Sequence, residues 1–269
     1  RGGYVLDLRG TDLRGVDLSG LDLSRALLSG ARLEGTDLTG AHLEGADLSR
    51  AHLEEADLRG AHMEGAYLGG VHLEGADLGA AHLKGAYLGG AHLEGSLLLT
   101  IHLEGTNLTG AHLEGADLSG AHLEEVDLRG AHLEGSLLLG VHLEGAVLRG
   151  AHLEGAYLTG AHLEGAELFG AHLVGADVTA ARVRAAAVTS DLSRVKGLTQ
   201  EQLDGLFADG SVTAAMLPEG LTRPAHWPEA VLGDVAFRDE WNKFKADPEG
   251  YKARAARGRS GGAAGLAGP

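Results

Sequence analysis

Hydrophobic and polar positions follow one another along this chain with a period of five residues. A leucine returns at every fifth position from Leu8 onward through 37 units, and only Met63, Val178, Val183 and Val188 replace it. Two positions before each leucine stands a small residue, most often alanine, and two positions after it glycine is usual. The positions between them are mostly polar. The pattern predicts short extended pieces joined by tight turns over residues 6–190.

A period of five fits neither the 3.6-residue period of an amphipathic helix nor the two-residue period of a flat strand. Because the register continues for about 185 residues without an insertion, it favours a solenoid, in which each unit stacks on its neighbours. The leucine and the small residue should point inward and fill a narrow core. The residues on either side of the leucine should point outward, and the glycine should occupy a turn conformation that other residues resist.

The units themselves carry a family resemblance. The segments ADLSG (116–120), TNLTG (106–110) and ADLRG (56–60) resemble the A(D/N)LXX units of pentapeptide-repeat proteins. The resemblance spans about residues 6–190, and it implies an all-β solenoid, a right-handed quadrilateral parallel β-helix with four units in each 20-residue coil. Thirty-seven units would then give about nine coils, or roughly 44 Å at the usual spacing of stacked strands.

The ends of the chain break the pattern. Residues 1–5 form a leader, and the repeat decays near 177–190, where valine replaces leucine and the turn glycine is lost. Residues 191–255 should form a small helical extension, and the glycine-rich residues 256–269 a flexible tail. In the extension, Thr199 and Gln202 have capping-box spacing, which predicts a helix over 200–208.

A second helix of the extension should start after the proline-rich loop 216–228. Pro228 suits the first position of that helix, which should end near 246–255. The apolar stripe of this helix should consist of Val231, Val235, Trp241 and Phe244, with Phe237 near its edge. Trp227 is expected to anchor the loop onto the end of the solenoid, and His226 to pack with it.

Charge is concentrated on the repeat. Residues 31–180 hold 23 acidic and 6 basic residues, a net of −17, whereas the remaining residues are near neutral. Such a surface repels nucleic acid and anionic membrane, so we expect no direct nucleic-acid binding and a protein partner with basic character. The chain has no cysteine and no long apolar run. We expect no membrane segment in it and a cytoplasmic location, although the sequence starts at Arg1 without a methionine.

Histidine and glutamate repeat every ten residues, so a 20-residue coil would place them in columns on two opposite faces. Each histidine precedes a leucine and a glutamate usually follows that leucine, as in His42–Leu43–Glu44. Imidazole and carboxylate are good zinc or copper ligands. The candidates for a metal array are His42, His62 and His82 on one face, and His52, His72 and His92 on the other.

Two other interpretations of these columns remain open. A flat ladder offers no point where three or four ligands converge, so the columns can simply be products of duplication, and we expect no metal and no cofactor. Alternatively, protonated histidines beside the glutamates relieve repulsion between stacked carboxylates. In that case the protein should melt at a higher temperature at pH 5.5 than at pH 8, and equal melting temperatures would contradict this pH-responsive interpretation.

The other two faces are less regular and carry outward apolar residues. The segments SLLLT (96–100) and SLLLG (136–140) are two coils apart, so their outward leucines should share a face with a tyrosine one coil further on. A group of this kind suggests a contact patch for a partner or for a homodimer. Its members are Leu97, Leu99, Leu137, Leu139 and Tyr157. Tyr67 and Tyr87 form a smaller candidate on the opposite face.

The sequence contains no enzyme signature such as a P-loop, G-x-S-x-G or H-E-x-x-H, and a solenoid with a filled interior offers no concave site. The leading hypothesis is therefore a non-catalytic, rigid acidic scaffold for protein–protein interaction. One alternative comes from the family resemblance, because the pentapeptide-repeat family includes dimeric members that imitate duplex DNA and protect DNA gyrase. A second alternative is a metal- or pH-responsive histidine–glutamate ladder.

Overall fold

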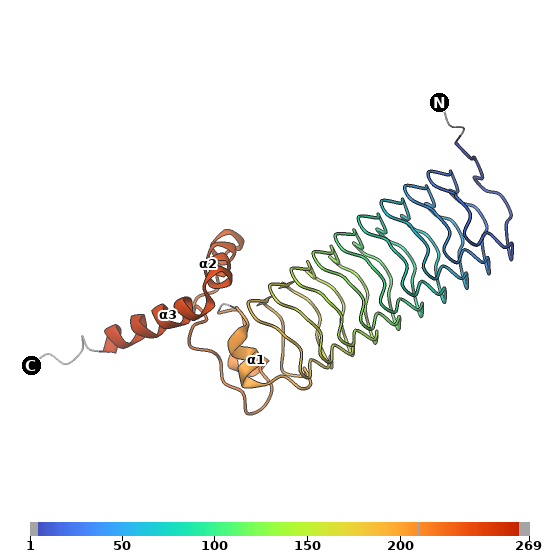
Figure 1. The fold of residues 1–269 in the computed structure, drawn as a ribbon. Helices are drawn as coiled ribbons and strands as arrows, with labels where there is room; N and C mark the ends of the chain where they lie inside the picture. The colour runs from blue at the N-terminus through green and yellow to red at the C-terminus, as the bar shows by residue number, and fades with distance from the viewer. Residues whose placement is uncertain (1–4, 209, 264–269) are drawn as a thin grey trace, which may run out of the picture.

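The computed structural model describes residues 5–208 and 210–263, and it shows an elongated rod followed by a helical C-terminal part (Figure 1). In the rod, each extended piece pairs in parallel with the piece 20 residues later, as His42 does with His62. Most of these pairings are single bridges. The pairing is longer between β1 (Glu167–Leu168) and β2 (Ala187–Val188), which align Glu167 with Ala187. The 20-residue spacing agrees with four units in each coil.

Two sets of backbone hydrogen bonds build the coils. Between coils, the Leu43 amide donates to the carbonyl of His62 at 2.7 Å, and the His42 amide donates to Leu21 at 2.9 Å. Within a coil, the Ala46 amide donates to the Leu43 carbonyl at 3.0 Å and closes a turn through Glu44 and Gly45. The backbone groups of the short pieces are thus paired without long strands.

The turn glycines explain why the pattern needs glycine at this position. Gly45 has a φ of 64°, in the left-handed region that side chains with a Cβ resist. Thr100 and Glu55 occupy the same turn position with φ values of 53° and 59°. A β-branched residue is the most strained of these exceptions.

The core consists of the leucines and small residues that the sequence pattern predicts to point inward. Leu43 and Ala41 are fully buried, as are the equivalent residues of most units, and together they form one continuous apolar cluster. Serine and threonine replace alanine at a few of the small inward positions. Their hydroxyls donate to backbone carbonyls, as from Ser96 to Leu93 at 2.7 Å and from Ser136 to Leu133 at 2.8 Å. A hydroxyl can therefore enter the core without an unpaired polar group.

The capping box of the first helix is confirmed. The helix α1 (Gln200–Gly205) begins after Thr199, whose side chain accepts from the Gln202 amide, while the Gln202 side chain accepts from the Thr199 amide. It ends three residues before the predicted end at 208. The reason is that the chain returns to the solenoid pattern, because Phe207 pairs with Ala187.

Trp227 is buried in the solenoid cluster as expected, and its Nε1 donates to the Leu206 carbonyl at 2.9 Å. His226 packs edge-on against it, as expected, with ring centroids 6.4 Å apart, and also stacks on Phe244 at 5.1 Å. A short 3₁₀ helix, Ala214–Met216, precedes this region.

The predicted second helix differs from the structure in three ways. It begins six residues later than Pro228, it is followed by a separate helix, and its apolar stripe is different. The observed helices are α2 (Asp234–Ala246) and α3 (Pro248–Ala263). Val231 and Val235 are exposed, at 70% and 76%.

Three aromatic residues explain the difference. Phe237, Trp241 and Phe244 are all buried, and Trp241 Nε1 donates to the Ala185 carbonyl at 2.9 Å. These three residues lie on one face of the helix, and Val235 lies on another. Docking onto the solenoid end thus selects the aromatic face, and Phe237 stands within the stripe rather than at its edge.

The predicted flexible tail is wrong for residues 256–263, which continue helix α3. Residues 264–269 of that tail, and residues 1–4 of the predicted leader, lie outside the described residues. The handedness, the count of about nine coils and the domain boundaries at 190 and 255 stay predictions.

Candidate functional site

The two histidine columns exist as predicted. Histidines 20 residues apart are bridged neighbours along both faces, and their rings lie 4.4–5.1 Å apart between centroids. Most of these rings are parallel within 8°. The pair His142–His162 differs, because its rings are 4.4 Å apart and tilted by 51°.

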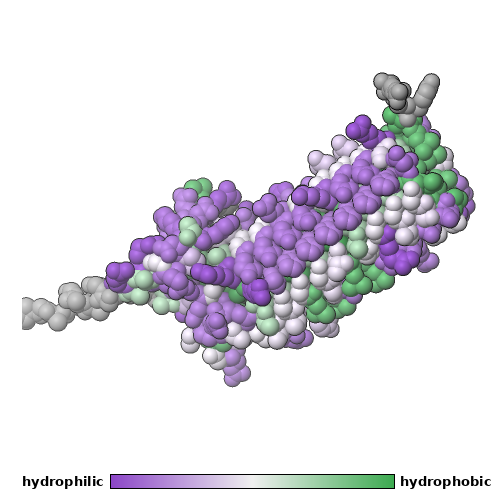
Figure 2. Space-filling model, viewed as in Figure 1, coloured by the Kyte–Doolittle hydropathy of each residue, from purple (hydrophilic) through white to green (hydrophobic). Residues whose placement is uncertain are grey.

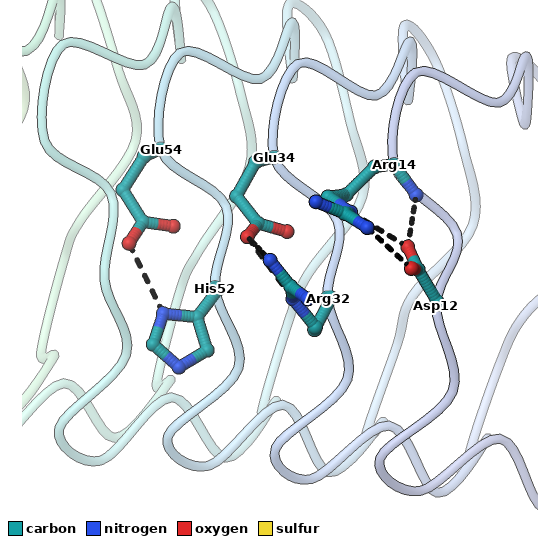
Figure 3. A network of polar contacts seen from close by, with 6 residues as sticks. All are labelled: Asp12, Arg14, Arg32, Glu34, His52 and Glu54. Carbon is teal, nitrogen blue, oxygen red and sulfur yellow. Dashed lines mark hydrogen bonds and ion pairs between the residues drawn. The ribbon is translucent and has the colours of Figure 1, made fainter.

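Most histidines of the columns face a glutamate two residues later, whereas His82 precedes Lys84 and His172 precedes Val174 in this pattern. Figure 3 shows the start of one face, where His52 Nδ1 lies 3.0 Å from Glu54 Oε1 and Arg32 takes the place of histidine beside Glu34. Nearer the C-terminus, glutamates also contact the histidine of the next coil, as Glu154 contacts His172 at 3.6 Å. The columns therefore form a connected ladder rather than isolated pairs.

Two glutamates of the ladder, Glu44 and Glu104, have a lowered pKa. Burial of the Glu104 carboxylate acts to raise its pKa, but bonds from its own amide and from His102, with the nearby imidazole charge, lower the pKa overall. The pKa of Glu44 is lowered in the same way, with an added bond from Ser24. Their charged state suits them as ligands for cations.

The ladder does converge on points, contrary to the expectation from sequence. Several trios of two histidines and one glutamate have ligand atoms that all lie within 4.8 Å of one another. They include His52–Glu54–His72, His72–Glu74–His92, His132–Glu134–His152, His142–Glu144–His162 and His152–Glu154–His172. The expectation was wrong because it treated the columns as flat, whereas a glutamate can lie between two stacked rings. His52, His72 and His92 thus stand in such trios, and His42 lies 3.1 Å from Glu44.

The apolar residues of the less regular faces point outward as predicted. Leu97, Leu99 and Leu139 are 41–43% exposed and Tyr157 is 48% exposed, whereas Leu137 is half-buried. The bridges connect Leu97 through Asp117 to Leu137 and then to Tyr157, so all five residues share a face. We call these five residues the leucine face.

A polar coil separates the two halves of the leucine face. Asp117 and Ser119 occupy that coil, and the Ser119 hydroxyl donates to Asp117 at 2.5 Å. The apolar groups therefore stand on alternate coils with a carboxylate between them.

The two tyrosines of the opposite candidate meet each other. The rings of Tyr67 and Tyr87 stack with centroids 5.3 Å apart and planes within 7°, and both are 52% exposed. An open groove beside them is lined by backbone at Gly69 and Gly89 and by Arg50. The flat aromatic pair and the bare backbone make this the second apolar contact candidate.

Comparison with known proteins decides the family. The sequence pattern of the pentapeptide repeats matches in eight copies, over residues 7–45, 26–65, 37–75, 61–98, 101–135, 127–165 and 146–184, which is more than half of the chain. This protein belongs to the pentapeptide-repeat family. No curated protein sequence matches it.

Solved structures include other members of this family. The pentapeptide-repeat protein HetL of the cyanobacterium Nostoc sp. strain PCC 7120, described as involved in heterocyst differentiation regulation, is 36% identical. The match covers 67% of this chain and 88% of HetL, with a TM-score of 0.34. Trypsin-treated QnrB1, a plasmid-mediated fluoroquinolone resistance protein, is 19% identical over 69% of this chain and 91% of its own, with a TM-score of 0.40. A protein of the Arabidopsis thaliana thylakoid lumen is 25% identical over 36% of this chain and 68% of its own, with a TM-score of 0.31.

One feature of this pentapeptide-repeat protein was missed by sequence reasoning. An open cavity of about 1100 Å³ lies where the last coils meet α1 and α3, and charged side chains from Glu164, Arg182, Arg184, Asp204 and Lys252 line it. Its walls come from segments far apart in the chain, so no local motif marks it.

The surface of the rod has distinct hydrophilic and hydrophobic areas (Figure 2). Figure 2 shows a hydrophilic band along the rod and a hydrophobic area at its N-terminal end, where Val5, Leu6, Val16 and Leu21 are exposed. Across the residues that the structure describes, none of the helices has the length and apolar character needed to cross a membrane.

Proposed function

We propose that this protein is a non-catalytic acidic scaffold that binds a protein partner through the leucine face. The observation that supports it is the exposure of leucines at outward positions that are elsewhere polar. Leu97 stands between Asp77 and Asp117 in its column, and the turn positions one coil away from Leu99 and Leu139 carry glycine, serine or threonine. Apolar side chains at these positions add nothing to the core and are most useful in a contact.

The arrangement favours a partner that is both apolar and basic. The two leucine pairs are two coils apart, or about 9.6 Å at the usual strand spacing. Residues seven apart on a helix are separated by a similar distance, about 10.5 Å. Asp117 lies between the pairs and Asp77 precedes them in the same column. An amphipathic helix with basic residues beside its apolar stripe would meet both the leucines and the carboxylates.

Affinity capture from the native cell tests this proposal. The bait with Leu97, Leu99, Leu137 and Leu139 changed to Ser should lose the partner that the unchanged bait recovers. Leu6→Ser with Leu21→Ser is the matched control, since these leucines are also exposed but lie at the N-terminal end. Recovery of the same proteins by all three baits would show that the leucine face is not the binding site.

Self-association through the leucine face or through the C-terminal helices is a related proposal. Sedimentation velocity distinguishes these two routes. A dimer that the four Leu→Ser changes convert to a monomer would identify the partner as a second copy. A dimer unaffected by them would assign the contact to the helices.

DNA mimicry remains the alternative function, and the net charge of −17 over residues 31–180 is the observation that favours it. Duplex DNA of about 36 Å carries roughly 21 charges, which is a similar density. Here, however, most ladder carboxylates have an imidazole neighbour, as Glu144 has His142 and His162, and Asp57 and Asp127 are paired with arginine. A gyrase supercoiling assay separates the two functions, since a scaffold of the proposed kind should leave supercoiling unchanged at micromolar protein.

A further inference from the structure

The end of one histidine column has a geometry that the rest of the ladder lacks. His142 and His162 are tilted by 51° instead of being stacked. His142 Nδ1 and His162 Nδ1 both approach the same atom, Glu144 Oε1, at 3.4 and 3.2 Å, which is closer than the corresponding pairs around Glu134 and Glu154. Two nitrogens and one carboxylate oxygen from adjacent coils therefore aim at one point.

These distances match those between the ligands of a small metal ion. Zinc binds imidazole nitrogen and carboxylate oxygen at about 2.0–2.2 Å, so two ligands of a tetrahedral ion are about 3.3–3.4 Å apart. Both measured nitrogen–oxygen distances lie within about 0.2 Å of that value, and the whole trio is within 4.8 Å. An ion could enter the trio with small side-chain movements.

The surroundings hold the trio in place and supply charge. The side chain of His162 is only 21% exposed, which is less than its neighbours in the column. Glu144 Oε2 is buried, so the carboxylate has little freedom to turn Oε1 away from the two rings. Glu124 and Glu164 flank Glu144 in its column, and they add negative charge against the positive charge of Arg182, which follows His162.

We propose that His142, Glu144 and His162 bind a divalent transition-metal ion such as Zn²⁺, with water completing the coordination. Two imidazoles and one carboxylate suit zinc, whereas Ca²⁺ and Mg²⁺ take oxygen ligands almost entirely. Each imidazole would bind through Nδ1 as the neutral tautomer with its proton on Nε2. This role is independent of the proposed partner contact, because the leucine face does not include these residues.

The other trios should bind the ion more weakly. Their nitrogens lie farther from the shared oxygen, as around Glu154 at 3.7 and 3.6 Å or from His152 to Glu134 at 3.9 Å, so larger movements are needed before both reach a shared ion. His72 also belongs to two trios, as does His152. Since one Nδ1 can bind one ion, the neighbouring trios compete with each other.

Calorimetric titration of the full chain with ZnCl₂ at pH 7.5 is the test. We expect a first, tighter binding event with about one equivalent, followed by weaker events. Glu144→Gln and His162→Gln should each weaken the first event by at least the roughly 10–100-fold that loss of an outer-shell partner causes. Co²⁺ bound to the unchanged protein should give the strong visible absorption of a four-coordinate ion, and both variants should lose it.

Glu167→Gln is the matched control, because it removes one negative charge from the neighbouring face outside the ladder. Its first binding event should be unchanged. Binding should also weaken as the pH is lowered, since protons compete with the ion for Nδ1. Absence of zinc binding below millimolar concentration would overturn the proposal, and so would equal binding by Glu144→Gln, His162→Gln and the unchanged protein.

Discussion

The two histidine–glutamate faces and the two less regular faces are built on the same backbone and the same core. His112 and Asp117 occupy equivalent positions in successive units, and Leu113 and Leu118 beside them are equally buried. The backbone bonds have the same pattern, and the Leu113 and Leu118 amides donate to the next coil at 2.7 and 2.8 Å. Outward side chains therefore contribute little to the fold, which leaves them free to serve a function or simply to repeat.

The largest effect should come from the core and should be the same on every face. Leu113→Ala, beneath the ladder, and Leu118→Ala, beneath the column of Asp117, should each lower the free energy of unfolding by about 2–5 kcal/mol. Both remove a buried side chain and leave a cavity in the same apolar cluster. Urea denaturation checks this. A cost below about 1 kcal/mol on one face alone would show that the faces do not share an equivalent core.

The turn position should give the next effect, and the two leucine-rich units offer a matched pair. Thr100 and Gly140 end SLLLT and SLLLG with φ values of 53° and 60°. Thr100→Gly should stabilise the protein and Gly140→Thr should destabilise it, each by about 1–2 kcal/mol, because a left-handed residue with a Cβ is strained. No atom lies within 4 Å of the position that a Cβ would take at Gly140, so Gly140→Thr tests backbone strain without steric crowding of the Cβ. Melting temperatures that shift in the same direction for both changes would contradict this account.

A smaller effect on stability should come from an ion pair on a less regular face, and it should depend on pH. Hydrogen bonds from the Arg59 side chain, with its charge, lower the pKa of Asp57. A lowered pKa contributes stability above the unfolded value of about 3.9, and this contribution is lost as pH falls through the folded pKa. Arg59→Gln should lower stability only slightly at pH 7, because the pair is exposed, and by less at pH 2 than at pH 7.

Denaturation of the Arg59→Gln variant at both pH values measures this effect, with Arg149→Gln as a control that lacks an aspartate two residues earlier. An equal cost at pH 7 and pH 2 would mean that Arg59 stabilises by packing and not through the charge of Asp57.

The smallest effect on stability should come from the leucine face itself. Changing Leu97, Leu99 and Leu139 to Ser removes exposed side chains, so each change should alter the free energy of unfolding by no more than about 0.5 kcal/mol. Circular dichroism melting curves check this. A large loss of stability would show that these leucines serve the fold, and would remove the argument for a contact surface.

The sequence was sufficient for the repeat because each unit repeats the same local choice. Inward Leu43, small Ala41 and turn Gly45 follow from periodicity and turn chemistry alone, and the columns follow once the coil length is known. It failed where distant segments meet. The exposure of Val235 depends on how Phe237 and Trp241 dock on the solenoid end.

The geometry of the ladder also could not be predicted from the sequence. Its histidines have closely similar neighbours in the chain, yet the ring of His162 is tilted against that of His142, whereas the other neighbouring rings are stacked. The column ends there, because Arg182 follows His162 instead of another histidine. Side-chain orientation at such an end depends on three-dimensional contacts, which a repeating sequence does not encode.

Site-specific photo-crosslinking tests the central claim most directly, because it asks which face touches a partner. A photoreactive residue at position 99 or 139 on the leucine face is compared with one at position 114 or 134 on the ladder. The account predicts a crosslinked partner, or a crosslinked second copy, from the leucine-face positions and none from the ladder positions. Crosslinks from the ladder positions alone would contradict it and move the binding site to the histidine–glutamate faces.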